Sequence, residues 1–165
     1  MNDRPPAPGG LALLEALVNT LDIETGADSL DMPEARERFA LTPPDLPAAR
    51  DLREALRAAC LAHAGHGTST TLDTLLADAR LRVAIAPDGS AAVRAFGPAT
   101  LLSRVAEAIA TATADGTWTR LKACEAEDCH WAYYDRSPGG RSRWCSMSVC
   151  GARTKMRTYR ARRTP

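Results

Sequence analysis

The chain has 165 residues, of which 45% are hydrophobic and 25% are charged, a composition that suits one soluble domain, or one domain with a small module. No run approaches the ~20 apolar residues of a membrane span, so no membrane partner is expected. The net charge of +1 conceals a polarity, because residues 1–119 carry 10 Arg and 16 acidic residues (−6), whereas residues 120–165 carry 11 Lys or Arg and 4 acidic residues (+7).

Helical patterns dominate the first part of the chain. Apolar residues recur at helical intervals and predict helices over residues 9–22, 34–41 and 46–66, with another turn or two over 71–79. Pro43 and Pro44 break the chain before the third helix, and Gly65 and Gly67 lie at its end. Cys60 falls on the apolar pattern of this helix, so we expect it to be a small buried hydrophobe.

A strand pattern then interrupts the helices. Apolar residues alternate along 81–86 and 91–96, and the turn Pro87-Asp88-Gly89-Ser90 separates these runs, which predicts a β-hairpin. Helical periodicity returns over 99–114. We therefore expect a mainly α fold: a multihelical domain with one β-hairpin over residues 1–118, followed by a small C-terminal module over residues 119–165.

Asn19, Thr20 and Asp22 form a polar cluster at the end of the first predicted helix. One interpretation is local, since such side chains hydrogen-bond the backbone of the following turn. The other places them in a pocket for an unknown effector. Buried polar groups are usually satisfied structurally, which favours the local interpretation. The same helical domain is a candidate for homodimer formation.

Four cysteines in the last quarter of the chain form two C-x4-C pairs, Cys124 with Cys129 and Cys145 with Cys150. Zinc binds four thiolates in a tetrahedron, and each short-spaced pair can supply one edge of it, so the pairs predict one structural zinc ion. The alternative is two disulfides. Residues 1–10 are polar and lack the apolar core of a signal peptide, so we expect a cytoplasmic protein with reduced thiols. His130 is expected to lie outside the ligand set.

The residues around these pairs predict a small finger. Residues 130–135 form an aromatic, strand-like run, residues 137–140 form a turn and residues 141–144 return to Cys145, which predicts a hairpin whose tryptophans and tyrosines cover the metal. Zinc should supply much of the folding free energy of so small a module. Ser146 is a candidate N-cap for a basic helix over 147–162.

The finger resembles a known family. Trp131, Tyr133, Asp135, the run W-C-S-M at 144–147 and the run C-G-A-R-T-K-M-R at 150–157 are similar to the CGNR zinc finger of bacterial proteins. In that family the finger follows an ABATE domain, and residues 17–22 (LVNTLD) resemble the N-terminal signature of this domain, as the 81–89 segment resembles its hairpin. The resemblance implies a stress-induced transcription regulator.

One residue departs from the family pattern. The Asn of the C-G-N-R motif is Ala152 in this chain. If that Asn reads a base or caps the knuckle, the contact is lost here. Alternatively, Ala152 packs against the N-terminal domain.

The basic end of the chain favours nucleic acid as a partner. Nine basic residues follow Asp135 without an acidic one, which creates a field suited to phosphates. A sixteen-residue helix is about 24 Å long, enough to lie along a DNA major groove. We expect Arg153 and Arg157 to face the groove. The candidate nucleic-acid-binding residues are Arg141, Arg143, Arg153, Lys155, Arg157, Arg160, Arg162 and Arg163.

These patterns predict a DNA-binding transcription regulator in the cytoplasm, associated with the nucleoid. RNA binding and a protein-interaction module with purely structural zinc remain as alternatives. Catalysis is not expected, because four thiolates leave no open metal position for water.

Overall fold

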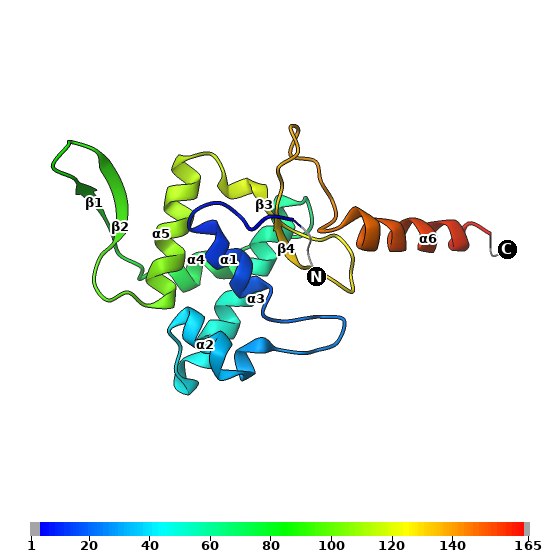
Figure 1. Ribbon diagram of the computed structural model, residues 1–165, viewed down its shortest axis with the longest axis horizontal. Helices are drawn as coiled ribbons and strands as arrows, with labels where there is room; N and C mark the ends of the chain where they lie inside the picture. The colour runs from blue at the N-terminus through cyan, green and yellow to red at the C-terminus, as the bar shows by residue number, and fades with distance from the viewer. Residues whose placement is uncertain (1–3, 164–165) are drawn as a thin grey trace.

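The computed structural model describes residues 4–163, which form a helical body and a C-terminal segment that carries the paired cysteines (Figure 1). Most predicted helices are present, and the mainly α fold is confirmed. The helices are α1 (Leu11–Val18), α2 (Pro33–Phe39), α3 (Leu46–His63), α4 (Thr71–Leu76), α5 (Leu101–Ala114) and α6 (Ala152–Ala161). The strands are β1 (Leu81–Ile85), β2 (Ala91–Ala95), β3 (Leu121–Ala123) and β4 (Ala132–Tyr134). None of the helices in residues 4–163 is long and apolar enough to cross a membrane.

Local polar groups explain where several helices begin and end. Thr100 caps α5, because its side chain accepts a hydrogen bond from the Ser103 N–H. Helix α1 ends at Val18, earlier than the predicted residue 22, because the chain turns there. The Thr20 hydroxyl donates to the Leu17 carbonyl, and the Asp22 carboxylate accepts from the Glu24 N–H. The local interpretation is therefore confirmed for Asp22, whereas Thr20 bonds back to the end of α1 and also accepts from Arg53 of α3.

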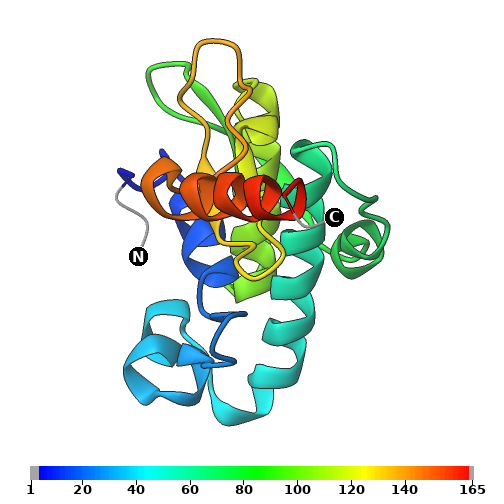
Figure 2. The same cartoon turned by 90° about the vertical axis from the view of Figure 1, so that its right-hand side faces the viewer.

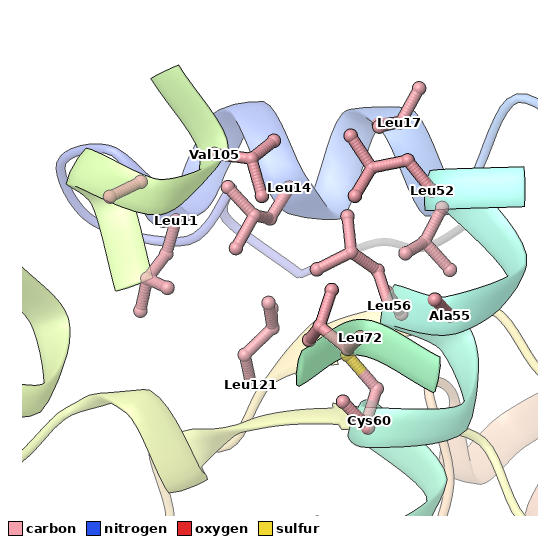
Figure 3. Close-up of a cluster of buried hydrophobic side chains, with 14 of the residues drawn as sticks. Leu11, Leu14, Leu17, Leu52, Ala55, Leu56, Cys60, Leu72, Val105 and Leu121 are labelled. Atoms are coloured by element: carbon pink, nitrogen blue, oxygen red, sulfur yellow. The ribbon is translucent and has the colours of Figure 1, made fainter. Parts of the chain in front are cut away.

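One hydrophobic core joins the helices to the finger segment. Leucines of α1 and α3 meet Leu72 of α4 and Val105 of α5, and Leu121 of β3 packs into the same cluster (Figure 3). Ala123 and Ala132 also belong to it. The predicted domain boundary at residues 118/119 stays a prediction, but apolar packing is continuous across it. The position of the finger is therefore set by the helices.

The β1–β2 hairpin has the predicted strands and turn. Its antiparallel register pairs Val83 with Val93, and the Glu107 carboxylate of α5 accepts a hydrogen bond from the Ala95 N–H. The hairpin projects from one end of the molecule, whereas α6 projects from the other (Figure 1).

The second hairpin differs from the predicted one in its pairing. β4 pairs antiparallel with β3, with Lys122 opposite Tyr133, and not with residues 141–144. The reason is Asp135, which is fully buried and accepts hydrogen bonds from the N–H groups of Ser137 and Ser142. These bonds fold residues 136–142 into a loop and leave the edge of β4 to β3.

Candidate metal centre

The first cysteine pair lies at the end of the β3–β4 hairpin. Cys124 follows β3 directly, and its N–H donates to the Trp131 carbonyl, which extends the ladder by one bond. The N–H groups of Cys129 and His130 both donate to the Ala126 carbonyl, so the four residues between the cysteines form a tight knuckle. His130 adopts φ 49°, a left-handed conformation that reverses the chain into β4.

The second pair flanks the start of the C-terminal helix. The chain makes one π-helical turn over Met147–Gly151 before α6 begins, and Cys150 lies within that turn. The Ser146 side chain accepts from the Val149 N–H, which confirms Ser146 as the N-cap. Cys145 therefore precedes the cap and Cys150 is presented by the first turn, near the positive end of the helix dipole.

The four sulfur atoms have the spacing of a zinc site. All lie within 4.8 Å of one another, with Cys129–Cys145 and Cys145–Cys150 separations of 3.6 and 3.7 Å. A tetrahedron with Zn–S bonds of about 2.3 Å has edges of roughly 3.8 Å. A disulfide needs about 2.05 Å, and none of the five cysteines is in one. The donor set fits one structural zinc ion, as predicted.

The thiols form one electrostatic unit. Hydrogen bonds from the Cys129 and Cys145 thiols lower the pKa of Cys124, whereas burial raises the pKa of Cys150. Negative charge on one sulfur therefore opposes ionisation of the others. A divalent cation at the centre removes this conflict, because zinc ligands bind as thiolates.

Three of the predicted aromatic side chains cover the cysteines, whereas Tyr134 packs against the helical core instead. Tyr133 is buried in the cysteine cluster, and Trp131 and Trp144 pack against it. Gly151 allows this packing, because a Cβ at this position would lie 3.1 Å from the Trp144 ring. A larger residue at the second letter of the C-G-A-R run would therefore have to push the Trp144 ring or the Met147 side chain aside by a few tenths of an ångström.

Asp135 organises the loop beside the metal site, a role that sequence reasoning did not assign. Its carboxylate accepts from two backbone N–H groups and lies 3.2 Å from the Lys122 ammonium. Burial would raise the pKa of Asp135, but hydrogen bonds from Ser137, Lys122 and Ser142 outweigh it and hold that pKa well below its usual range. Asp135 is thus a buried charged anchor for the loop.

Two side chains, one at the end of α1 and one in α3, hydrogen-bond residues 130–132 of the finger. The amide of Asn19 pairs with both backbone groups of Ala132, and Arg57 of α3 donates to the carbonyls of His130 and Val18. Neither earlier interpretation of Asn19 describes this contact, because the Asn19 amide binds the finger. The sequence analysis did not predict this role for Arg57. The signal was present, because Arg57 lies one helical turn from Arg53 on the apolar side of α3, where a buried arginine needs partners.

The N-terminal segment adds a further contact to the second knuckle. The Arg4 guanidinium donates to the carbonyls of Trp144 and Cys145 and stacks over the Tyr133 ring. Residue 4 is thereby brought next to residue 145, a proximity that no local sequence pattern indicates.

Both of the predicted groove-facing residues have acidic partners. Arg153 lies 2.9 Å from Asp128 and 3.1 Å from Glu24, and Arg157 lies 3.1 Å from the same Asp128 oxygen. Burial would raise the pKa of Asp128, but the hydrogen bond from Arg153 outweighs it and the pKa is lowered. These arginines therefore hold α6 against the first knuckle and the 22–28 loop.

The other predicted basic residues lie mostly at the surface. Arg143 pairs with Glu125, and Arg163 donates to the Tyr159 hydroxyl. Lys155 and Arg162 are exposed and lie beyond ion-pair distance of any acidic group in residues 4–163, as does Arg141 of the loop. Ala152 is exposed, so the alternative that it packs against the helical body is wrong.

Comparison with known proteins identifies the finger segment. Residues 120–163 match the CGNR zinc finger family. No curated protein matches the chain at a significant level. The match covers the metal centre and α6 and does not extend to the helical body, where the ABATE resemblance stays a prediction.

Proposed function

We propose that this chain is a DNA-binding transcription regulator whose structural zinc presents a basic helix to nucleic acid. The family match and the four-cysteine site support the zinc finger. The zinc has a structural role in this proposal, because four thiolates complete its shell and leave no position for a reacting water. The proposal places the protein in the cytoplasm, at the nucleoid.

The observation that carries the proposal is the position of α6. The helix extends from the finger into solvent, and none of its residues is buried (Figures 1 and 2). Six of the twelve residues from Ala152 to Arg163 are Arg or Lys. A protruding helix with this charge can enter a groove or follow a phosphate backbone without rearrangement of the body.

The ion pairs divide the basic residues into two groups. Arg153 and Arg157 face Asp128, so in the proposal they orient the helix. Lys155 and Arg162 lie on the opposite side of α6 and have no acidic neighbour among the described residues, so they are assigned to phosphates. Arg141 and Arg143 extend the basic surface onto the adjacent loop.

The experiment titrates the protein into random-sequence duplex DNA at several salt concentrations and measures binding by fluorescence anisotropy. Affinity should fall steeply with salt, and the Lys155→Ala/Arg162→Ala variant should lose about two units of the logarithmic salt slope. An Arg80→Ala/Arg82→Ala variant, with the same charge loss at the far hairpin, should keep the wild-type slope. Absence of binding by the zinc-loaded protein at low salt would refute the proposal.

Sequence preference is a separate outcome. Selection from random duplexes tests whether the finger without the motif Asn still reads bases. Enrichment of one site supports a specific regulator, whereas binding without enrichment, or preference for single-stranded RNA, reduces the proposal to general nucleic-acid binding.

An exposed apolar strip favours protein interaction as the second candidate. Met147, Val149, Met156 and Tyr159 are each about half exposed or more and lie along the finger helix. Exposed apolar side chains on a free helix suit docking onto a protein groove. A Met156→Lys/Tyr159→Lys variant should abolish capture of such a partner while it retains DNA binding.

A further inference from the structure

A cavity lies where the helical body, the N-terminal segment and the finger meet. Its volume is about 390 Å³, enough for a small organic molecule. Its wall comes from one face of α1, from α2, from the N-terminal segment and from Trp131, which precedes β4. The side chains that matter below are Glu15, Asn19, Arg38, Phe39, Trp131 and Arg4.

Glu15 is a buried acid in this wall. It is only 7% exposed, and within residues 4–163 it accepts one hydrogen bond, from the Ala7 N–H. Burial raises the pKa of Glu15, and the Ala7 hydrogen bond and the nearby Arg136 charge counter only part of this effect. A carboxylate has about four acceptor positions. Among the described residues no cation lies within ion-pair distance of Glu15, so the cavity wall holds an acceptor with unused capacity.

Arg38 provides the opposite charge at the rim of the same cavity. It is exposed, it has no carboxylate within ion-pair distance in residues 4–163, and its guanidinium lies 5.9 Å from the Phe39 ring centre. Arg4 also lines the cavity, but its guanidinium already binds the Trp144 and Cys145 carbonyls. Arg38 is therefore the cation available to a bound anion.

The remaining groups give the cavity its shape. Asn19 and Thr20 line it, but their polar atoms are engaged by Ala132 and Leu17. Trp131 of the finger, which is half-buried, contributes aromatic surface to the cavity, whereas Phe39 of α2 lies behind the wall with only 1% of its surface exposed. An aromatic wall favours a flat ring stacked against it.

We propose that this cavity binds a small aromatic zwitterion, with its cationic group on Glu15, its anionic group on Arg38 and its ring against Trp131. Each charged group of the ligand meets an opposite charge that has no ionic partner within the described chain. Such charge-assisted hydrogen bonds are the strong ones in protein sites.

The inference rests on the proposed function, because it names the chemistry of an effector for the regulator. Trp131 packs against the cysteine cluster, and Arg4 binds the backbone carbonyl of the zinc-binding residue Cys145. A molecule in the cavity would thus touch two residues that also contact the metal centre. Its binding nevertheless can be measured without nucleic acid.

The test uses four probes on the zinc-loaded full chain: 4-(aminomethyl)benzoate, L-phenylalanine, benzylamine and benzoate. The first two are aromatic zwitterions with separated and adjacent charges, and the last two carry one charge each. Ligand-observed NMR and calorimetry should show that at least one zwitterion binds about tenfold more tightly than either singly charged probe. Equal binding of all four probes, or no binding, would overturn the proposal.

Two variants assign the contacts. Glu15→Gln keeps an acceptor for the Ala7 N–H and should abolish the advantage of the zwitterion over benzoate. Arg38→Met is an exposed substitution that should abolish its advantage over benzylamine, and Arg36→Met on the same helix, outside the cavity, should bind like wild type. If both cavity variants keep the wild-type preference, the site is wrong. DNA titrations without probes report separately on the proposed function.

Discussion

The side-chain amide of Asn19 binds the backbone of Ala132 as a neighbouring strand would. Its Oδ1 accepts from the Ala132 N–H at 2.7 Å, and its Nδ2 donates to the Ala132 carbonyl at 3.0 Å. Ala132 is fully buried, so its backbone groups have no access to water. One side chain at the end of α1 thereby satisfies the outer edge of β4 and fixes the finger on the helical body.

Asn19→Ala should destabilise the whole protein. It leaves two buried backbone groups without partners, which costs about 2–4 kcal/mol. Urea unfolding monitored by tryptophan fluorescence measures this change in the free energy of unfolding. Thr111→Ala, an exposed substitution on α5, is the control and should change it little. If Asn19→Ala lowers the free energy of unfolding by less than about 0.5 kcal/mol, the Asn19–Ala132 hydrogen bonds make no net contribution to stability.

Loss of zinc should unfold the finger and weaken the helical body with it. Cys124→Ala removes one thiolate, so bound zinc should fall from one ion per chain and the melting temperature should drop. The helices are affected because Leu121, Ala123 and Ala132 of the finger lie in their core. Zinc analysis and calorimetry on the same sample test both statements, and an unchanged melting temperature would contradict the shared core.

Cys60 supplies the matched control for the metal prediction. It is fully buried in α3, and burial raises the pKa of its thiol to about 12. Cys60→Ala should keep one zinc ion per chain and lose only about 1 kcal/mol of stability. In the native zinc-loaded protein its thiol should not react with disulfide reagents, because it is neither exposed nor ionised.

His63 should make the protein sensitive to mild acid. Its Nδ1 donates to the Leu121 carbonyl at 2.8 Å, and burial lowers its pKa below the ordinary value near 6.5. At a pH between the folded and unfolded pKa values of His63, the unfolded chain binds more protons than the folded one. The stability that neutral His63 contributes is therefore present above about pH 6.5 and is lost as the pH falls.

The pH test compares wild type with His63→Gln in urea unfolding from about pH 7.5 to 5.5. Gln can still donate to the Leu121 carbonyl but does not titrate. The variant should lose stability with acid more slowly than wild type, and bound zinc measured at each pH separates this effect from protonation of the thiolates. Parallel curves would mean that His63 does not contribute.

Arg153 should slow the release of zinc. A cavity of about 110 Å³ opens onto Cys129, Cys145 and Cys150, and Arg153 lies in its wall between Glu24 and Asp128. Glu24→Gln breaks the bridge to the helical body and leaves the ligands untouched. Transfer of zinc to a coloured chelator should become about two- to fivefold faster, the range expected for one exposed ion pair.

Glu34→Gln carries the same charge change on α2, away from the metal, and is the control for this rate. If Glu24→Gln and Glu34→Gln release zinc equally, the bridge does not restrain the cavity.

Much of the fold was predictable because it depends on near neighbours in the chain. The apolar period located α1 to α5, the Pro87–Ser90 turn located the β1–β2 hairpin and Ser146 marked the entry to the basic helix. The strand pairing of the finger was predicted wrongly. Residues 141–144 return to Cys145 in the sequence, but the buried carboxylate of Asp135 holds them in a loop.

The amino-acid sequence by itself determined the metal centre, because two short knuckles place their thiols with little help from distant parts of the chain. Only the tertiary structure decided what Asn19, Arg57 and Arg153 do. Their partners, Ala132, His130 and Glu24, lie 73 to 129 residues away along the chain. Such contacts form only after the core has brought α1, α3 and the finger together, and no local pattern records them.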